Sequence, residues 1–181
     1  CLGDALLNTR QKDVGVAIVN IGASTTALTV YEEGELLHSA VIPIGSDHVT
    51  ADIAIGLRTS LDIAELLKRQ YVNAAAQNVN KFQDIDLQSL GAPGSEIVSL
   101  RFVSDIAQAR VEELFERVEQ ELKKVDRSGM LPAGVLLTGG GVKLEGVPEV
   151  AKQILRLPAV IAQPQLPPTA LEDVLHDPAF S

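Results

Sequence analysis

The chain has 181 residues, of which 46% are hydrophobic and 22% are charged, so it can bury a substantial core and is not a disordered protein. Its net charge of -9 argues against a surface for nucleic acid or anionic membrane, because both require clustered Lys and Arg. The single cysteine, Cys1, excludes a disulfide framework and fits a reducing cytoplasm. The chain starts without Met and ends in mid-sequence. We therefore expect it to be part of a longer protein.

The first predicted element is a β-hairpin over residues 14–31, where two apolar runs flank one short polar loop. This loop, residues 22–26, combines small residues with three consecutive hydroxyl side chains. Backbone N–H groups in such a loop can approach an anion closely, and Ser or Thr can donate to its oxygens. Taken alone, the loop is better explained as an ordinary hairpin turn. Only a second phosphate or nucleoside element elsewhere would favour a ligand.

A third strand is predicted over residues 36–43, which completes an antiparallel meander, and His38 within it receives no role. The next segment predicts a helix that Ser46 or Asp47 would cap. Its apolar face would consist of residues at i, i+4 and i+8, namely Val49, Ile53 and Leu57.

A Thr-x-x-Asp capping box at Thr59 predicts a second helix that runs to about Asn73. Within it, Glu65 and Lys68 are spaced i, i+3 and could present an acceptor and a donor to the same small molecule. A solvent-exposed ion pair explains the same spacing, and the spacing alone favours that explanation.

The middle of the chain predicts a small β element followed by one long helix. Residues 82–87 and 96–102 are each expected to form a strand, with a Gly-Pro turn between them. Ser104 is expected to cap a helix that reaches about Val125, and Gly129 is expected to close it. Its apolar positions step by three or four: Ala107, Val111, Leu114, Val118, Leu122 and Val125.

A second glycine-rich loop follows a short buried-type strand predicted over residues 134–138. Three consecutive glycines, residues 139–141, leave a backbone against which a flat nucleoside or a diphosphate could lie. A sharp strand-to-helix connection explains the same glycines, and a helix is expected to begin near Pro148. A last strand is predicted over residues 160–162, before an extended Pro-rich segment at 164–178.

These two loops, separated by a mostly helical insertion, form one pattern together with residues 42–45, 52–59 and 64–68. The pattern covers nearly the whole chain and resembles the second half of actin-like proteins, most closely the bacterial cell-division protein FtsA. The resemblance implies half of an actin-like (ribonuclease H-like) α/β ATPase, a β-meander plus helices with an inserted α+β lobe. Subdomain 2A would comprise residues 1–57 and 134–181, and subdomain 2B would be residues 58–133.

The resemblance also implies ATP with Mg²⁺ as the cofactor of the whole protein, held partly by lobes absent from this chain. The first loop would line the phosphates, the glycines would pass beside the nucleoside, and the pair on the second helix would reach ribose and adenine. Asn20 and Ala27 stand where the family commonly has Asp, so we expect weak or absent ATPase activity. The implied cofactor-binding residues are Asn20, Gly22, Ala23, Thr25, Glu65, Lys68, Gly139, Gly140 and Gly141.

An FtsA-like protein would polymerise at the inner face of the cell membrane, reach the membrane through a segment absent here, and link the FtsZ ring to it. The C-terminal tail of FtsZ would lie on the long helix, where Arg110, Glu113 and Arg117 form a polar stripe that could pair with a charged peptide. A solvated helix face explains that stripe equally well. Two alternatives share the fold: a PilM-like component of a pilus assembly platform, and a sugar or acetate kinase.

Overall fold

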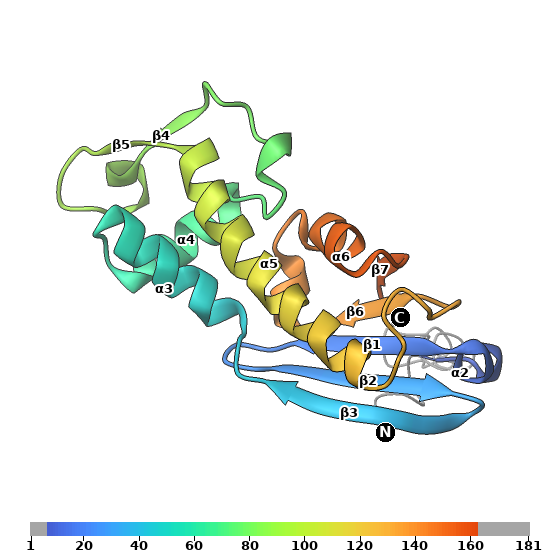
Figure 1. Cartoon of the computed structure of the whole chain (residues 1–181). Coiled ribbons are helices and arrows are strands. Elements are labelled where there is room, and N and C mark those ends of the chain that lie inside the picture. The colour runs from blue at the N-terminus through green and yellow to red at the C-terminus, as the bar shows by residue number, and fades with distance from the viewer. Residues whose placement is uncertain (1–6, 163–181) are drawn as a thin grey trace, which may run out of the picture.

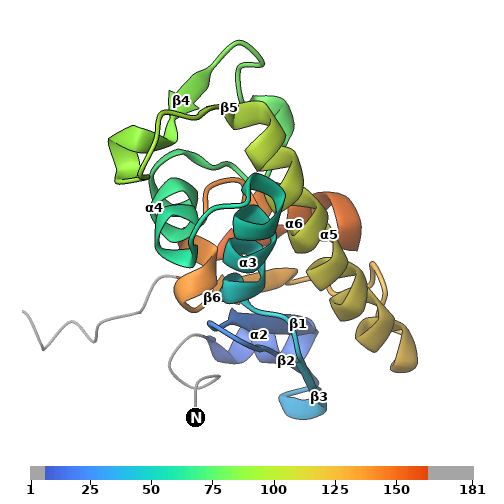
Figure 2. The same cartoon turned by 90° about the vertical axis from the view of Figure 1, so that its left-hand side faces the viewer.

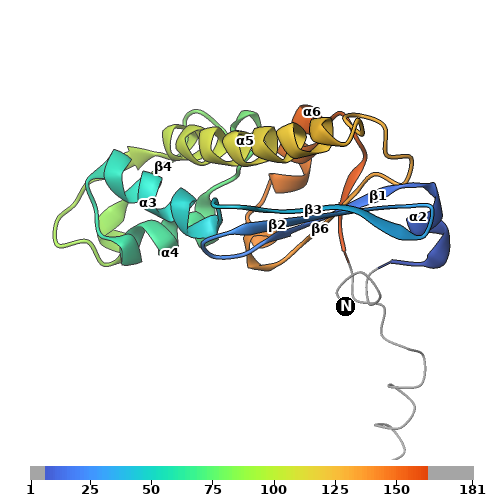
Figure 3. The ribbon, with the colours of Figure 1, turned by 60° about the horizontal axis from the view of Figure 1, so that its bottom comes forward.

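The computed structural model describes residues 7–162. A five-stranded mixed sheet in the order β3-β2-β1-β6-β7 forms the base of the molecule, and helices α5 and α6 lie across one face of it (Figures 1 and 3). β1 pairs antiparallel with β2 and parallel with β6. The strands are β1 (Val16–Ile21), β2 (Thr26–Glu32), β3 (Glu35–Ile42), β6 (Val135–Thr138) and β7 (Ala159–Ile161).

The predicted meander is confirmed, because β1, β2 and β3 occupy the three expected segments and pair antiparallel in sequence order. A short helix before it, α2 (Thr9–Val14), was not predicted. Asn8 and Gln11 form a capping box around its first turn, and this spacing was the only available signal. Six residues are too few to show a helical period, so the sequence pattern does not predict this helix.

The two helices after the meander are confirmed as α3 (Ser46–Leu57) and α4 (Leu61–Tyr71), but their predicted caps are wrong. Gly45 precedes α3, and the ring Nδ1 of His48 accepts its backbone N–H at 3.1 Å. Ser60, not Thr59, caps α4, because the Ser60 hydroxyl accepts the N–H of Ile63 at 3.4 Å. The apolar stripe of α3 is buried as predicted.

The insertion contains β4 (Asp84–Asp86) and β5 (Ile97–Ser99) with short 3₁₀ turns η1 (Ala76–Asn78) and η2 (Leu87–Leu90). The strand prediction at 96–102 is wrong beyond residue 99, because helix α5 (Leu100–Lys124) starts there.

Ser104 is therefore inside α5 and does not cap it. It is fully buried, and its hydroxyl accepts the N–H of Asn73 at 3.2 Å. The polar side chain that suggested a cap instead satisfies a backbone group just after α4. The other end of α5 also differs from prediction, because Asp126 takes a left-handed conformation with φ of 56° three residues before Gly129.

After β6, the chain makes a 3₁₀ turn, η3 (Gly140–Lys143), and helix α6 (Val147–Leu155), which packs against α5. One continuous core runs from the sheet into the insertion and includes Ile53, Phe115 and Leu137. The division into subdomains 2A and 2B stays a prediction. The predicted Pro-rich segment at 164–178 lies outside the described residues. Between residues 7 and 162, none of the helices is both long enough and apolar enough to cross a lipid bilayer.

Candidate functional site

A cleft of about 450 Å³ opens where the two predicted loops meet. The loops are 113 or more residues apart in the chain, but β1 and β6 are parallel neighbours, with Asn20 beside Thr138, so both loops leave the same edge of the sheet. This volume is in the range of about 300–1,000 Å³ that is typical of ligand sites. The cleft is lined by Ala23, Ser46, Glu65, Lys68, Arg69, Gly140, Gly141, Lys143 and Leu144.

Glu65 and Lys68 form the polar wall of the cleft that α4 supplies. The Lys68 ammonium lies 2.6 Å from a Glu65 carboxylate oxygen and donates to the Thr50 hydroxyl at 2.7 Å and to the Ser46 carbonyl at 3.2 Å. Only 7% of the Lys68 side chain is exposed, against 41% for Glu65. The pair is therefore not a solvent-exposed ion pair, because its cation is buried among three oxygen acceptors.

The environment of Glu65 favours its charged form. Partial burial alone would raise the pKa of this carboxyl group, but hydrogen bonds from Lys68 and Thr50 and the charges of Lys68 and Arg69 bring its pKa below the ordinary value. The Thr50 hydroxyl donates to Glu65 at 2.6 Å, so the carboxylate receives a bond from each neighbour. Glu65 is thus a fixed anionic acceptor in the lining of the cleft.

The first loop is tied to the start of α3 by its own backbone. The Gly22 N–H donates to the Thr25 carbonyl at 2.9 Å, which closes the turn. The carbonyls of Gly22 and Ala23 accept the N–H groups of Ser46 and Asp47 at 3.0 and 2.9 Å. Of the predicted loop residues, Ala23 lines the cleft, whereas Asn20, Gly22 and Thr25 do not.

The three glycines of the second loop have different surroundings. Gly139 has φ of 93°, and a Cβ there would lie 2.4 Å from both the Asn20 side-chain oxygen and the Ile21 carbonyl oxygen. A Cβ on Gly141 would lie 2.3 Å from the Ile21 side chain, whereas Gly140 has no neighbour within 4 Å of that position. Gly139 and Gly141 thus allow close packing on β1, and Gly140 presents open backbone to the cleft.

Sequence reasoning did not predict three of the other cleft residues as site residues, namely Ser46, Arg69 and Lys143. Arg69 directly follows Lys68 and Lys143 follows the glycines, but only the fold brings these two segments together. The lining contains three cationic side chains and one carboxylate, a formal charge of 3 - 1 = +2, in a chain whose net charge is -9. This local excess of positive charge suits an anionic ligand.

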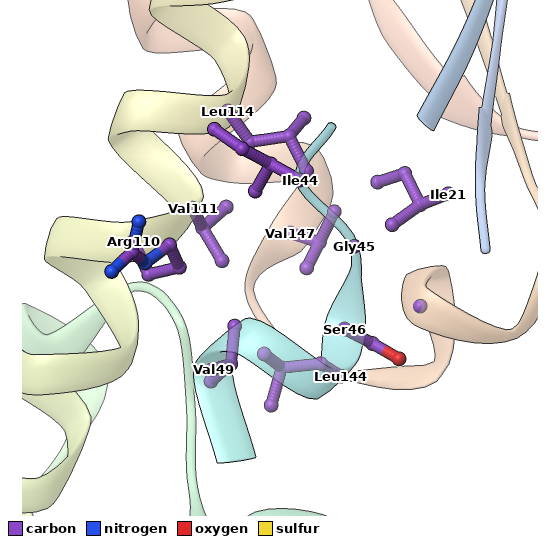
Figure 4. Close-up of a pocket in the computed structure, with 11 residues that line it drawn as sticks. Ile21, Ile44, Gly45, Ser46, Val49, Arg110, Val111, Leu114, Leu144 and Val147 are labelled. Atoms are coloured by element: carbon purple, nitrogen blue, oxygen red, sulfur yellow. The ribbon is translucent and has the colours of Figure 1, made fainter. Parts of the chain in front are cut away.

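A small apolar pocket of about 20 Å³ adjoins the cleft, and Figure 4 shows the residues that line the pocket. It shares Ser46, Gly141 and Leu144 with the cleft. Its remaining walls come from β1, from α3 and the segment before it, and from α5 and α6. They include Ile44, Val49, Val111 and Val147. The start of α3 therefore lies between the cleft and a packing gap.

A groove of about 480 Å³ runs between the end of β3 and the side of α5, and the predicted stripe of Arg110, Glu113 and Arg117 lines it. Arg110 donates to both carboxylate oxygens of Asp52, at 2.6 and 3.0 Å, and to Glu113 at 2.6 Å. The hydrogen bond from Arg110 to Asp52 is the main cause of a raised Arg110 pKa. Arg117 is more available, because 55% of its side chain is exposed and its nearest carboxylate, Glu113, is 3.9 Å away.

Comparison with known proteins decides the family, because the family model described as "Cell division protein FtsA" matches residues 17–181. The chain belongs to the FtsA family. It is 36% identical to the FtsA of Pseudomonas aeruginosa, with 98% of the chain and 42% of that protein aligned. It is 37% identical to the FtsA of Neisseria meningitidis, with 99% of the chain and 43% of that protein aligned. The chain thus spans less than half the length of these relatives.

Solved structures show that the fold is actin-like α/β. MreB5 of Spiroplasma citri, in a crystal structure bound to ADP, has a TM-score of 0.70 at 20% identity over 88% of the chain and 51% of that protein. The type IV pilus complex PilM-PilN has a TM-score of 0.60 at 19% identity over 92% of the chain and 43% of the matched protein. The likeness to PilM is therefore one of fold, whereas the FtsA match is one of sequence family.

Proposed function

We propose that this chain supplies half of an ATP-binding site in an actin-like cell-division protein. The observation that carries the proposal is the cleft itself, where a buried lysine, two further cations and a Cβ-free backbone segment converge on one opening of ligand size. This combination suits a nucleotide, because positive charge stabilises its phosphates and its flat base can lie against a backbone without side chains. The nucleotide-bound states of MreB5, with ADP and with AMPPNP, support the same assignment.

Within the cleft, we assign the phosphates to the backbone at Ala23 and the base and ribose to Gly140, Glu65 and Lys68. The Lys68 ammonium has three donors and three partners, Ser46, Thr50 and Glu65, so a ligand hydroxyl or ring nitrogen would take the place of one of these partners. We expect four of the predicted residues to shape the loops without contacting the ligand: Asn20, Gly22, Thr25 and Gly139.

The described residues do not fit a protein-held Mg²⁺. Across residues 7–162, no group of three or more His, Cys, Asp or Glu side chains is placed to hold a metal ion. The one carboxylate in the cleft lining, Glu65, already accepts from Lys68 and Thr50. Mg²⁺ prefers carboxylate oxygens, and this chain has Asn20 and Ala27 where the family commonly has Asp. We propose ATP binding with weak or absent hydrolysis.

We propose that the whole protein polymerises and links the FtsZ ring to the inner face of the cell membrane, with the groove beside α5 as the place for the FtsZ tail. The groove has a volume of about 480 Å³, and Arg117 offers an exposed cation in its lining. Charged groups of this kind fix the register of a peptide more than they add affinity.

Titration calorimetry with ATP tests the nucleotide assignment. Lys68→Met keeps an apolar stem of similar length but removes the buried ammonium, and we expect it to abolish detectable binding while the far-ultraviolet circular dichroism is unchanged. Lys152→Met is the matched control, because Lys152 is an exposed lysine of α6 outside the cleft. ATP binding that survives Lys68→Met, or that is lost equally in the control, would overturn the assignment.

A further inference from the structure

Helix α3 touches both the cleft and the groove. It lies between α4 and α5 and packs against each of them (Figure 2). Through its first two turns, the Ser46 carbonyl and the Thr50 hydroxyl bind Lys68 of the cleft. Half a turn further along, Asp52 binds Arg110 of the groove. One rigid element thus carries both sets of polar contacts.

The contacts on the two sides of α3 compete with the contacts a ligand would make. Lys68 cannot turn its ammonium fully to a ligand while it donates to Ser46 and Thr50, and a peptide carboxylate that takes the Nε and Nη2 edge of Arg110 must displace Asp52 from it. A ligand on either side therefore loosens α3 from that side.

Space for a small movement of α3 exists at its first turn. The apolar pocket of about 20 Å³ is lined by Gly45, Ser46 and Val49 of this turn, with Val111 and Leu114 of α5 opposite (Figure 4). A fully packed interior would resist such a shift, because close-packed side chains transmit strain rather than absorb it. The gap is large enough for a displacement of side chains but not for a ligand.

We propose that α3 couples the cleft to the groove, so that occupation of one site favours occupation of the other. A ligand that takes Lys68 and Glu65 from Thr50 frees the start of α3, and the helix then releases Arg110 more easily from Asp52. By thermodynamic reciprocity, a peptide that takes Arg110 from Asp52 favours nucleotide in the cleft by the same factor. The coupling rests on the proposed function, because it takes ATP as the ligand of the cleft.

Two isosteric substitutions cut the coupling without touching the lining of the cleft. Thr50→Val removes the hydroxyl that joins α3 to Lys68 and Glu65, and Asp52→Asn removes the charge that joins α3 to Arg110. Asp105→Asn is the matched control. It also removes one carboxylate from an arginine pair, Arg101–Asp105 at 3.3 Å, but both partners of that pair lie on α5.

Calorimetry with ATP measures the coupling directly. Because Asp52→Asn frees α3 in advance, it should tighten ATP binding by about fivefold, the lower end of common coupling factors, while Asp105→Asn leaves the affinity unchanged. With Thr50→Val in the same chain, Asp52→Asn should lose its effect on ATP affinity, because the connection is already cut. Equal ATP affinities for Asp52→Asn, Asp105→Asn and the unmodified chain would overturn the proposal.

A second measurement needs no nucleotide and separates failure of the coupling from failure of the proposed function. The ¹⁵N-edited signal of the Arg110 Nε–H group reports its bond to Asp52. We expect Thr50→Val to shift this signal although Thr50 does not contact Arg110, and Asp105→Asn to leave it in place. An Arg110 signal that is identical in Thr50→Val and the unmodified chain would refute the coupling, even if ATP binds.

Discussion

Replacing Gly139 by Ala should destabilise the protein far more than replacing its neighbour Gly140 by Ala. At Gly139 the backbone has φ of 93°, which side-chain-bearing residues rarely adopt, and an added Cβ would lie 2.4 Å from two oxygens of β1, those of Asn20 and Ile21. At Gly140 no atom lies within 4 Å of an added Cβ. The two substitutions add the same methyl group one residue apart, so each controls for the other.

The expected magnitude follows from two separate costs. A residue held in an unfavourable backbone region costs about 1–3 kcal/mol. Forcing an extra carbon into a packed site costs about 1–3 kcal/mol more. We therefore expect Gly139→Ala to lower the free energy of unfolding by about 3 kcal/mol or more, which corresponds to about 6–12 °C in the melting temperature of a chain of this size. Gly140→Ala should change it by less than about 0.5 kcal/mol.

Urea unfolding followed by circular dichroism measures both variants against the unmodified chain. The reasoning that Gly139 is required by the close approach of β6 and β1 fails if Gly139→Ala and Gly140→Ala have the same unfolding midpoint. It also fails if Gly140→Ala is the more damaging of the two. The slope of the unfolding free energy against urea should be the same for all three proteins, so that the midpoints compare stabilities.

Three further outcomes are expected. Asn20→Asp in the whole protein should raise ATP hydrolysis, measured as phosphate release, because it introduces the carboxylate that the family commonly has at this position and that Mg²⁺ prefers; equal rates at equal ATP occupancy would contradict this. Arg117→Glu should weaken the binding of an FtsZ tail peptide, measured by fluorescence anisotropy, without lowering the stability of the chain. Arg110→Glu should weaken binding and also destabilise the chain, because the new carboxylate would face Asp52 and Glu113. Unaltered peptide affinity in both variants would mean that the stripe is only a solvated surface. The unmodified chain should have a higher free energy of unfolding than Glu65→Gln, and this difference should shrink as the pH falls below about 4.3, the ordinary pKa of a glutamate carboxyl group. The reason is that a carboxyl group whose pKa is lowered in the folded state stabilises the fold only while it is charged. A difference that does not depend on pH would contradict this prediction.

The fold was predictable where periodicity was strong. The meander forms where it was predicted, the apolar stripe of α3 is buried, and the apolar positions predicted for α5 are buried except for Val125. Helix ends were not predictable to the residue. Ser104 resembled a cap because a cap and a buried hydroxyl that satisfies a distant backbone group have the same local sequence.

The sequence predicted part of the lining of the candidate cleft but not the burial of its charged side chains. The loops and the Glu65–Lys68 pair carried a signal, yet the burial of Lys68 depends on Thr50 and Ser46, which come from another helix. The three consecutive glycines look alike in the sequence, but they have two roles in the structure. Gly139 and Gly141 allow close packing on β1, whereas Gly140 faces the cleft. The sequence did not predict Arg69 and Lys143 as site residues, since their segments meet only through long-range contacts such as the backbone bridge between Asn73 and Glu145.

A residue-resolved titration of this chain with ATP, followed by amide chemical shifts, tests the central claim most directly. We expect weak binding, with a dissociation constant near the millimolar range, which corresponds to a binding free energy of about -4 kcal/mol. The reason is that half of the phosphate contacts of an actin-like clamp would lie in other lobes. The shifts should concentrate at Ala23, Lys68, Arg69, Gly140 and Lys143. Shifts confined to residues outside this cleft, or none at saturating ATP, would contradict the assignment of the site, and a submicromolar constant would contradict the half-clamp.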